Sequence, residues 1–252
     1  MRLFRRFLAR IGYISLGAVY AALGVFATTI AVAGSRDRVR GFRGAFRFLL
    51  SHPYGPAVVA AMAAGLAAFT LARLIDAADG KRSFFARVGS FIDAIGHAAL
   101  AWVAVAILLR LRRGASARPA LTWLLAQTWG PAVLKVAGVV VLAIGAFQIW
   151  QGLSGRLVQK PARHQIGAAA PVAIRVGRFG YVARGVVSAI VGWFLVRTAD
   201  AIDPRNYHDI GAALGVLESQ RFGPFLLALA GVGLVAYGAY LALLGVFRGR
   251  SQ

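Results

Sequence analysis

Long apolar runs separated by short basic loops dominate the hydrophobic pattern of this chain. Six such runs occupy roughly residues 11–33, 55–77, 88–110, 130–152, 179–199 and 223–247. A helix of about 20 residues, rising 1.5 Å per residue, crosses the hydrocarbon core of a bilayer, so each run is long enough to span it. Because lipid offers no hydrogen-bond partners, backbone groups must be satisfied within each segment, and we expect six transmembrane helices.

The pattern of apolar runs also repeats. A short motif, (A/G)-R-x-G-(Y/S), opens the first, third and fifth runs, at residues 9–13, 86–90 and 177–181. A triplet of an aromatic residue, glycine and proline opens the other runs, at Tyr54-Gly55-Pro56, Trp129-Gly130-Pro131 and Phe222-Gly223-Pro224. Proline suits the first turn of a helix, and an aromatic ring suits the headgroup level. We therefore expect a single membrane domain, 1–252, built from two-helix repeats at about 9–80, 86–155 and 177–249.

The orientation of the repeats follows from the number of spans in each. Two spans return the chain to its starting side, so all copies share one orientation. We predict an all-α polytopic membrane protein whose six transmembrane helices form three parallel two-helix repeats with a pseudo-threefold arrangement. Short amphipathic stretches precede the triplets and are expected to lie in the interface as helices, at Phe42–Leu50, Leu121–Ala126 and Ile210–Leu217.

The start of the chain has the form of a secretory signal. The basic segment MRLFRRFLAR precedes an apolar run, and Ala31-Val32-Ala33 resembles a cleavage site. The same kind of segment recurs twice later in the chain, where no signal peptide can act. We therefore expect residues 11–33 to remain as the first span of the mature protein.

Composition and charge agree with a membrane location. Hydrophobic residues make up 59% of the chain and charged residues 15%, against roughly a quarter charged in soluble proteins. The net charge is +21, but the basic residues lie in short loops beside apolar runs, where they bind anionic headgroups. A nucleic-acid-binding protein instead gathers them on one face of a soluble fold, so we expect no nucleic-acid partner. The arginines before the first span favour cytoplasmic termini.

The threefold recurrence of the arginine–glycine motif makes a family resemblance visible. Tandem pairs of spans that each open with this motif resemble the bacterial integral-membrane family catalogued as domain of unknown function 1206. The resemblance extends from Ala9 to about Arg248, and the second copy departs from it with Ser90 for tyrosine and Ala94 for glycine. It implies this fold and a location in the bacterial cytoplasmic membrane, but no activity, no cofactor and no catalytic residue.

Ionisable residues inside the spans are the candidate functional site, because each is costly there. Asp93 in the third run and Arg184 in the fifth occupy one position of the repeat, where the first copy has Leu16. We expect an ion pair between Asp93 and Arg184. It would serve either as a structural lock between the second and third repeats or as a polar site for a proton or an anionic solute. The alternative is that Arg184 reaches the headgroups.

Three more residues extend this candidate intramembrane polar site. His97 lies one turn beyond Asp93 on the same helix face, where an imidazole can relay protons. A metal site needs at least three ligands and only two are found, so no metal is expected. Arg73 and Asp76 end the second span on the membrane side where Asp93 begins, and are expected to pair with each other and to reach Asp93.

Other residues of the spans are assigned to packing or to local contacts. Lys135 stands alone near the start of the fourth run and is expected to extend towards the headgroups. Gln148 and Gln151 are expected to hydrogen-bond across helices. Small residues let helix backbones approach closely, and the glycines expected to do so are Gly12, Gly17, Gly24, Gly89, Gly180, Gly185 and Gly192.

Two hypotheses for the function follow. The first is a non-enzymatic membrane scaffold or accessory protein, and the second is a small-solute or proton channel or transporter that uses the polar site. We expect no enzyme, because the chain lacks a P-loop, a nucleotide fingerprint, an HExxH motif and a Ser-His-Asp arrangement. A dry, directly paired Asp93 and Arg184 would favour the scaffold, and a water-accessible Asp93 the transporter. A protein partner or a homo-oligomer is left open.

Overall fold

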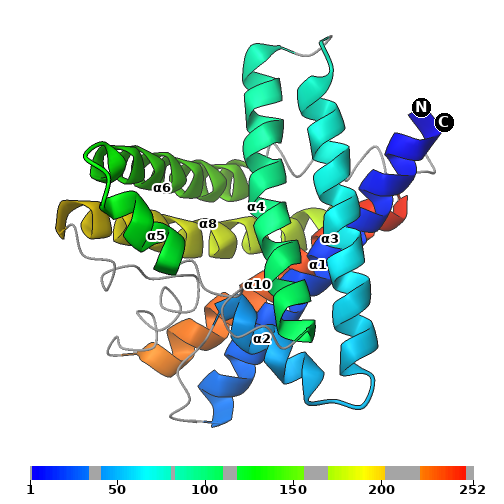
Figure 1. Cartoon of the computed structure of the whole chain (residues 1–252). Coiled ribbons are helices and arrows are strands. Elements are labelled where there is room, and N and C mark those ends of the chain that lie inside the picture. The colour runs from blue at the N-terminus through cyan, green and yellow to red at the C-terminus, as the bar shows by residue number, and fades with distance from the viewer. Residues whose placement is uncertain are drawn as a thin grey trace.

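The computed structural model describes residues 2–33, 41–80, 83–109, 118–155, 170–201 and 222–247. These residues form helices joined by short turns, with no strand among them, at α1 (Arg2–Ala33), α2 (Gly41–Leu50), α3 (Gly55–Ala78), α4 (Phe84–Leu108), α5 (Arg118–Leu125), α6 (Gly130–Ser154), α8 (Ala170–Ala201) and α10 (Gly223–Phe247) (Figure 1). Six helices, α1, α3, α4, α6, α8 and α10, are long and apolar enough to cross a membrane. The predicted all-helical class and the six spans are confirmed.

The short helices α2 and α5 stand immediately before the triplets that open α3 and α6. They cover two of the three stretches predicted to lie in the interface, and the third, 210–217, lies outside the described residues. The triplet glycines are needed for close approach, since a Cβ at Gly55 would overlap the carbonyl oxygen of Leu49 and a Cβ at Gly130 that of Leu124. The turn from short helix to span is therefore built in the same way in both repeats.

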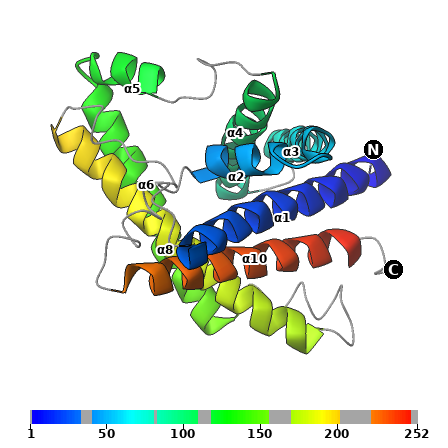
Figure 2. The same cartoon turned by 90° about the horizontal axis from the view of Figure 1, so that it is seen from below.

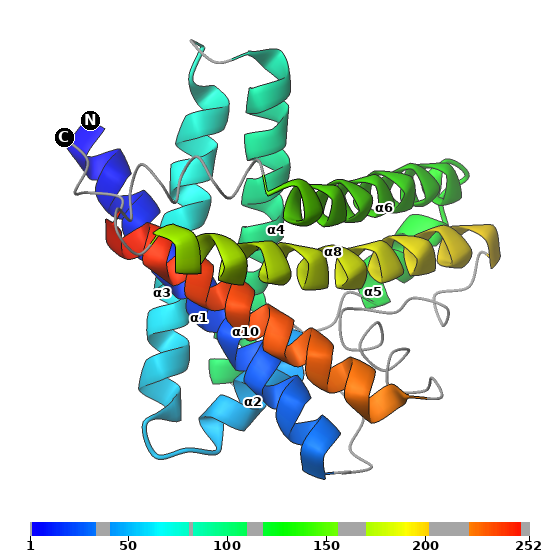
Figure 3. The same ribbon diagram turned by 180° about the vertical axis from the view of Figure 1, so that it is seen from behind.

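The spans pack as pairs that connect one repeat to the next. The closest pairs are α1 with α10, α3 with α4, and α6 with α8. Each joins the first span of one repeat to the second span of the preceding repeat, with the first repeat following the third. Figures 1 and 3 show the three pairs pointing in different directions from a shared centre.

Glycines allow the backbones of α6 and α8 to touch. A Cβ added to Gly185 would lie 2.8 Å from the carbonyl oxygen of Gly145, and one added to Gly192 would lie 2.8 Å from that of Gly138. The same contacts recur between α1 and α10, as Gly17 on Gly238 and Gly24 on Gly231. Residue numbers rise along one helix as they fall along the other, so both pairs are antiparallel. The shared orientation of the three repeats in the membrane remains a prediction.

Two of the three repeats also close on themselves. In the first, Gly12 of α1 lies against Phe69 of α3, and in the third, Gly180 of α8 lies against Tyr237 of α10. The packing role expected of Gly89 in the second repeat is wrong, because a Cβ there would meet nothing within 4 Å. The helices α4 and α6 are not packed on each other, and Figure 2 shows them apart. The spans thus form an open series, α4–α3–α1–α10–α8–α6, and the pseudo-threefold arrangement remains a prediction.

The buried core lies along α1, which contacts both α3 and α10. Leu23, Leu66 and Leu234 are completely buried there. Large apolar side chains on the outer faces of other spans are exposed, among them Trp102 and Trp193, as expected of surfaces that face lipid. The polar residues discussed next lie beside this core and contact its members Tyr20, Phe69 and Tyr237.

Candidate functional site

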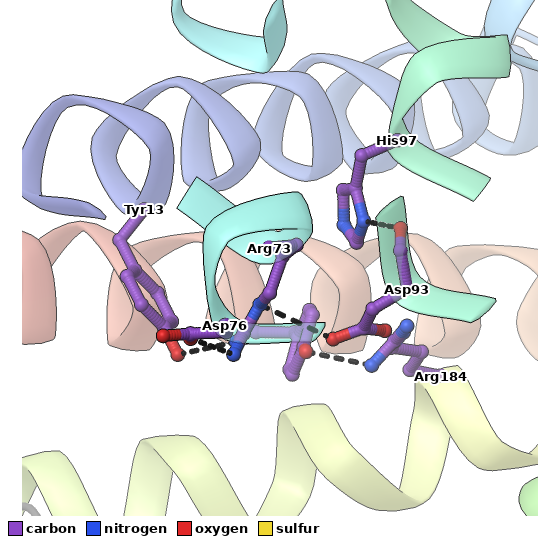
Figure 4. Close-up of polar contacts among 7 residues, drawn as sticks. Tyr13, Arg73, Asp76, Asp93, His97 and Arg184 are labelled. Atoms are coloured by element: carbon purple, nitrogen blue, oxygen red, sulfur yellow. Dashed lines mark hydrogen bonds and ion pairs between the residues drawn. The ribbon is translucent and has the colours of Figure 1, made fainter. Parts of the chain in front are cut away.

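Charged and polar side chains from several helices meet within the spans (Figure 4). Asp93 and His97 come from α4, Arg73 and Asp76 come from α3, and Tyr13 comes from α1. The packing of α4 on α3 brings the carboxylate of Asp93 to Arg73, which also contacts Asp76 of its own helix. The packing of α1 on α3 brings the hydroxyl of Tyr13 to the guanidinium of Arg73. We call these five residues, together with Arg184, the polar cluster.

Arg73 is the centre of the ionic contacts in the polar cluster. Its Nη1 donates to Oδ2 of Asp76 at 3.5 Å, and its Nη2 donates to the hydroxyl of Tyr13 at 3.1 Å. Its Nε lies 3.4 Å from Oδ2 of Asp93 in an ion pair without hydrogen-bond geometry. The guanidinium also lies 4.7 Å from the ring centre of Phe69. One cation is thus shared between two carboxylates through long contacts, and neither carboxylate holds it in a bidentate pair.

Arg184 does not form the ion pair with Asp93 that we predicted. Its Nε donates to the hydroxyl of Tyr20 at 3.1 Å and its Nη1 to that of Tyr237 at 2.7 Å. The guanidinium stacks on the same two rings, 5.3 and 4.9 Å from their centres. The structure describes both Arg184 and Asp93 and shows no ion pair between them within 4.0 Å. The physical reason is that α4 packs on α3, so Arg73 reaches Asp93 first.

The register of the repeats explains this choice of partner. When residues are counted from the glycine of each triplet, the same position of the second spans holds Arg73, Gln148 and Leu241. In the α3/α4 pair this position faces Asp93. The α6/α8 pair has the same register, since Arg178 bonds to Gly152 where Arg87 bonds to Ala77. Gln148 therefore takes the place of Arg73 in that pair. An alignment of the second spans, in addition to the first, would have identified Arg73 as the partner of Asp93.

His97 is buried and held in a fixed orientation. Its Nδ1 donates to the main-chain carbonyl oxygen of Asp93 at 2.5 Å, and its ring meets that of Phe69 edge-on at 4.6 Å between centres. A carbonyl oxygen only accepts, so Nδ1 carries the proton in this arrangement. The hydrogen bond therefore goes to the backbone of Asp93 and leaves its carboxylate aside. Among the described residues, no three His, Asp or Glu side chains gather in a way that could hold a metal ion.

The side chain of Asp93 is half exposed at the protein surface. It is 47% exposed, whereas the side chains of its neighbours Arg73 and Asp76 are 20% and 13% exposed. An ionised group within a span is costly unless water or another polar group reaches it. The exposure of Asp93 therefore distinguishes it from the other charged residues of the polar cluster.

The arginine of the repeat motif has a role that the sequence did not reveal. The Nε of Arg87 donates to the carbonyl oxygen of Ala77 at 2.9 Å, and the Nε of Arg178 donates to that of Gly152 at 2.9 Å. Arg178 also donates from Nη2 to the carbonyl oxygen of Leu153 at 2.5 Å. Both arginines thereby satisfy carbonyls at the C-terminal end of the second span in the preceding repeat, where a cation also opposes the helix dipole.

Two expectations about the fourth run need correction. Lys135 is not alone, since its Nζ lies 2.7 Å from Oδ1 of Asp200. The antiparallel packing of α6 on α8 brings the start of one helix to the end of the other. Gln148 and Gln151 are buried, but their Oε1 atoms have no hydrogen-bond partner in the described part of the chain, so these oxygens make no cross-helix bonds there.

The chain is similar to a known protein family and to a bacterial protein. The family model described as Domain of Unknown Function (DUF1206) matches three segments, residues 11–80, 88–155 and 179–248. The uncharacterized protein YxxB of Bacillus subtilis (strain 168) is 26% identical over 250 residues, which cover 95% of this chain and 90% of that protein. No solved structure matches the chain.

Proposed function

The chain belongs to the family described as Domain of Unknown Function (DUF1206), and from that premise we propose that this integral membrane protein moves a small solute or a proton through its polar cluster. The observation that carries the proposal is the half-exposed side chain of Asp93 within a span. A residue that only locked two repeats together would be expected to be buried against its partner. An accessible carboxylate beside a shared cation instead has the properties of a binding group.

The contacts of Arg73 suggest how such a site would work. Its guanidinium divides its charge between Asp76 and Asp93 at 3.5 and 3.4 Å. A proton or a cation arriving at Asp93 would weaken one of these contacts while Asp76 retains the other. Charge would then be rearranged within the cluster, and Arg73 would still have one carboxylate partner.

We place the protein in the bacterial cytoplasmic membrane with both termini in the cytoplasm and its basic loops against anionic headgroups. We assign it no catalytic reaction, in keeping with the lack of known catalytic motifs in its sequence.

A membrane scaffold is the second candidate function. The observation in its favour is the backbone contact between glycines of α6 and α8, and again of α1 and α10. Such interfaces pack helices tightly and resist relative movement. A scaffold does not require Asp93 to be reached from the aqueous phases.

Cysteine labelling separates the two candidates. The chain contains no cysteine, so a single introduced thiol reports on one position. Asp93→Cys is compared with Ala94→Cys, whose parent side chain is 1% exposed, in right-side-out and inside-out membrane vesicles treated with a membrane-impermeant maleimide. Transport predicts that Asp93→Cys reacts from both sides and much faster than Ala94→Cys. Equally slow labelling of both variants from either side would support the scaffold.

A further inference from the structure

The second repeat lacks a contact that the other two repeats make. Phe69 and Tyr237, which lie against Gly12 and Gly180, are 2% and 3% exposed. The corresponding residue of the second repeat, Ile144, is 39% exposed. The glycine that should receive it, Gly89, faces open space. The sides of α4 and α6 that carry Gly89 and Ile144 are therefore not packed on each other.

The sequence contains a steric reason for this opening. In the first repeat Gly65 approaches Ser15, and in the third Gly233 approaches Ala183, so closely that a Cβ on either glycine would overlap the partner. The residues at these positions in the second repeat are Val140 and Ile92. Two branched side chains cannot occupy the space that is already too small for one Cβ. The second repeat is thus prevented from closing in the way that the others do.

A second size difference leaves room beside the polar cluster. Val19 and Val187 occupy one position of the first spans and are fully buried. The second repeat has Gly96 there, and a Cβ at Gly96 would meet nothing within 4 Å. Gly96 directly precedes His97 and follows Asp93 by three residues, so it lies on the same side of α4 as the exposed carboxylate. Space of the size of a side chain is therefore available next to Asp93.

We propose that the polar cluster receives a phospholipid with a primary amine in its headgroup, which enters from the bilayer between α4 and α6. This inference rests on the proposed function and names the class of molecule that the site takes. Ile92, Val140 and Ile144 are exposed and apolar, which suits acyl chains. The ammonium group would donate to the carboxylate of Asp93. The span begins at Arg87, so Asp93 lies about 9 Å along the helix from that end, at 1.5 Å per residue.

Charge complementarity supports a zwitterionic headgroup. Figure 4 draws Arg184 near Asp93, and its guanidinium, which donates to Tyr20 and Tyr237, has no carboxylate within ion-pair distance in the described part of the chain. Its guanidinium supplies positive charge for the phosphate, while Asp93 supplies negative charge for the amine. A purely anionic headgroup would lack a partner for Asp93 and would be repelled by it.

Fluorescence quenching by brominated lipids tests the proposal. A fluorophore attached at Gly96→Cys reports on the space beside Asp93 and leaves Ile92 and Val140 in place. The protein is reconstituted in phosphatidylcholine vesicles that contain brominated-chain phosphatidylethanolamine or, at the same mole fraction, brominated-chain phosphatidylglycerol. A fluorophore at Leu229→Cys, on the exposed face of α10, is the control for bulk lipid.

We expect the ethanolamine lipid to quench the Gly96 reporter more strongly than the glycerol lipid, and the two lipids to quench the Leu229 reporter equally. Asp93→Asn should remove the difference at Gly96. Equal quenching of the Gly96 reporter by both lipids overturns the proposal. If Asp93→Cys is then still labelled from both sides of the membrane, the proposed function survives without the lipid.

Disulfide formation tests the opening itself. Gly89→Cys with Ile144→Cys should not form a disulfide, because Ile92 and Val140 keep the helices apart. Ile92→Ala and Val140→Gly introduce the residues that the third repeat has at these positions. Adding both substitutions should allow the disulfide to form and reduce quenching of the Gly96 reporter by the ethanolamine lipid. A rapid disulfide within one chain in the otherwise unchanged protein would show a closed repeat. A disulfide between chains would show a second copy in the lipid's place, and either result overturns the proposal.

Discussion

The glycine interface of α6 and α8 makes a quantitative prediction for a single methyl group. In Gly145→Ala the new Cβ would lie 2.6 Å from the backbone nitrogen of Ala189, whereas ordinary contacts begin at 3.4 Å. The helices must therefore separate by roughly 0.8 Å, since the atom in the way is backbone and cannot rotate aside. Overpacking of this kind costs about 1–3 kcal/mol. We expect Gly145→Ala to lower the free energy of unfolding by that amount.

Gly96→Ala is the matched control for this substitution. It makes the same chemical change within a span, but its Cβ meets no atom within 4 Å. Removing a glycine from a helix stabilises it by roughly 0.5–1 kcal/mol, so Gly96→Ala should be neutral or slightly stabilising. The assay is unfolding of the purified protein in mixed micelles by increasing SDS, followed by circular dichroism. If Gly145→Ala proves as stable as Gly96→Ala, the close contact between α6 and α8 is refuted.

Two further predictions concern the arginines. Arg178→Ala should lower the free energy of unfolding by about 1 kcal/mol, because the hydrogen bonds to the end of α6 are lost. Arg175 is exposed, and Arg175→Ala should leave the free energy of unfolding unchanged. Equal effects of the two substitutions in the same unfolding assay would contradict the capping role of Arg178. In double-mutant cycles, Asp93→Asn should couple to Arg73→Gln by about 0.5–3 kcal/mol and more weakly to Arg184→Gln. A stronger coupling to Arg184 would mean that the ion pair lies between α4 and α8.

The sequence determines the spans and the repeats because lipid imposes strict rules on them. Each apolar run had to be a helix, and the recurring arginine–glycine motif and triplets marked where each helix begins. Gly185 and Gly192 were identified as packing residues from their spacing of one heptad. Gly138 and Gly145 in the fourth run have the same spacing and supply the other side of that interface. A search for matched stripes would have paired these helices.

The partner of Asp93 was harder to predict, because it depends on which helices touch. Equivalent positions in the first spans suggested that Asp93 and Arg184 would face each other across a symmetry axis. The structure instead packs each first span on the second span of the preceding repeat, which brings Arg73 to Asp93. The effect of Val140 was also hidden, since a valine in an apolar run looks favourable until the facing residue is known.

The opening of the second repeat can be measured directly with spin labels. Labels at Ile95→Cys and Val136→Cys, both exposed, report the separation of α4 and α6 in nanodiscs by double electron–electron resonance. The corresponding pair in the closed third repeat is Val186→Cys with Leu229→Cys. We expect a clearly longer distance in the second repeat than in the third. Equal distances would show that both repeats close in the same way, and would remove the access to Asp93 on which its role depends.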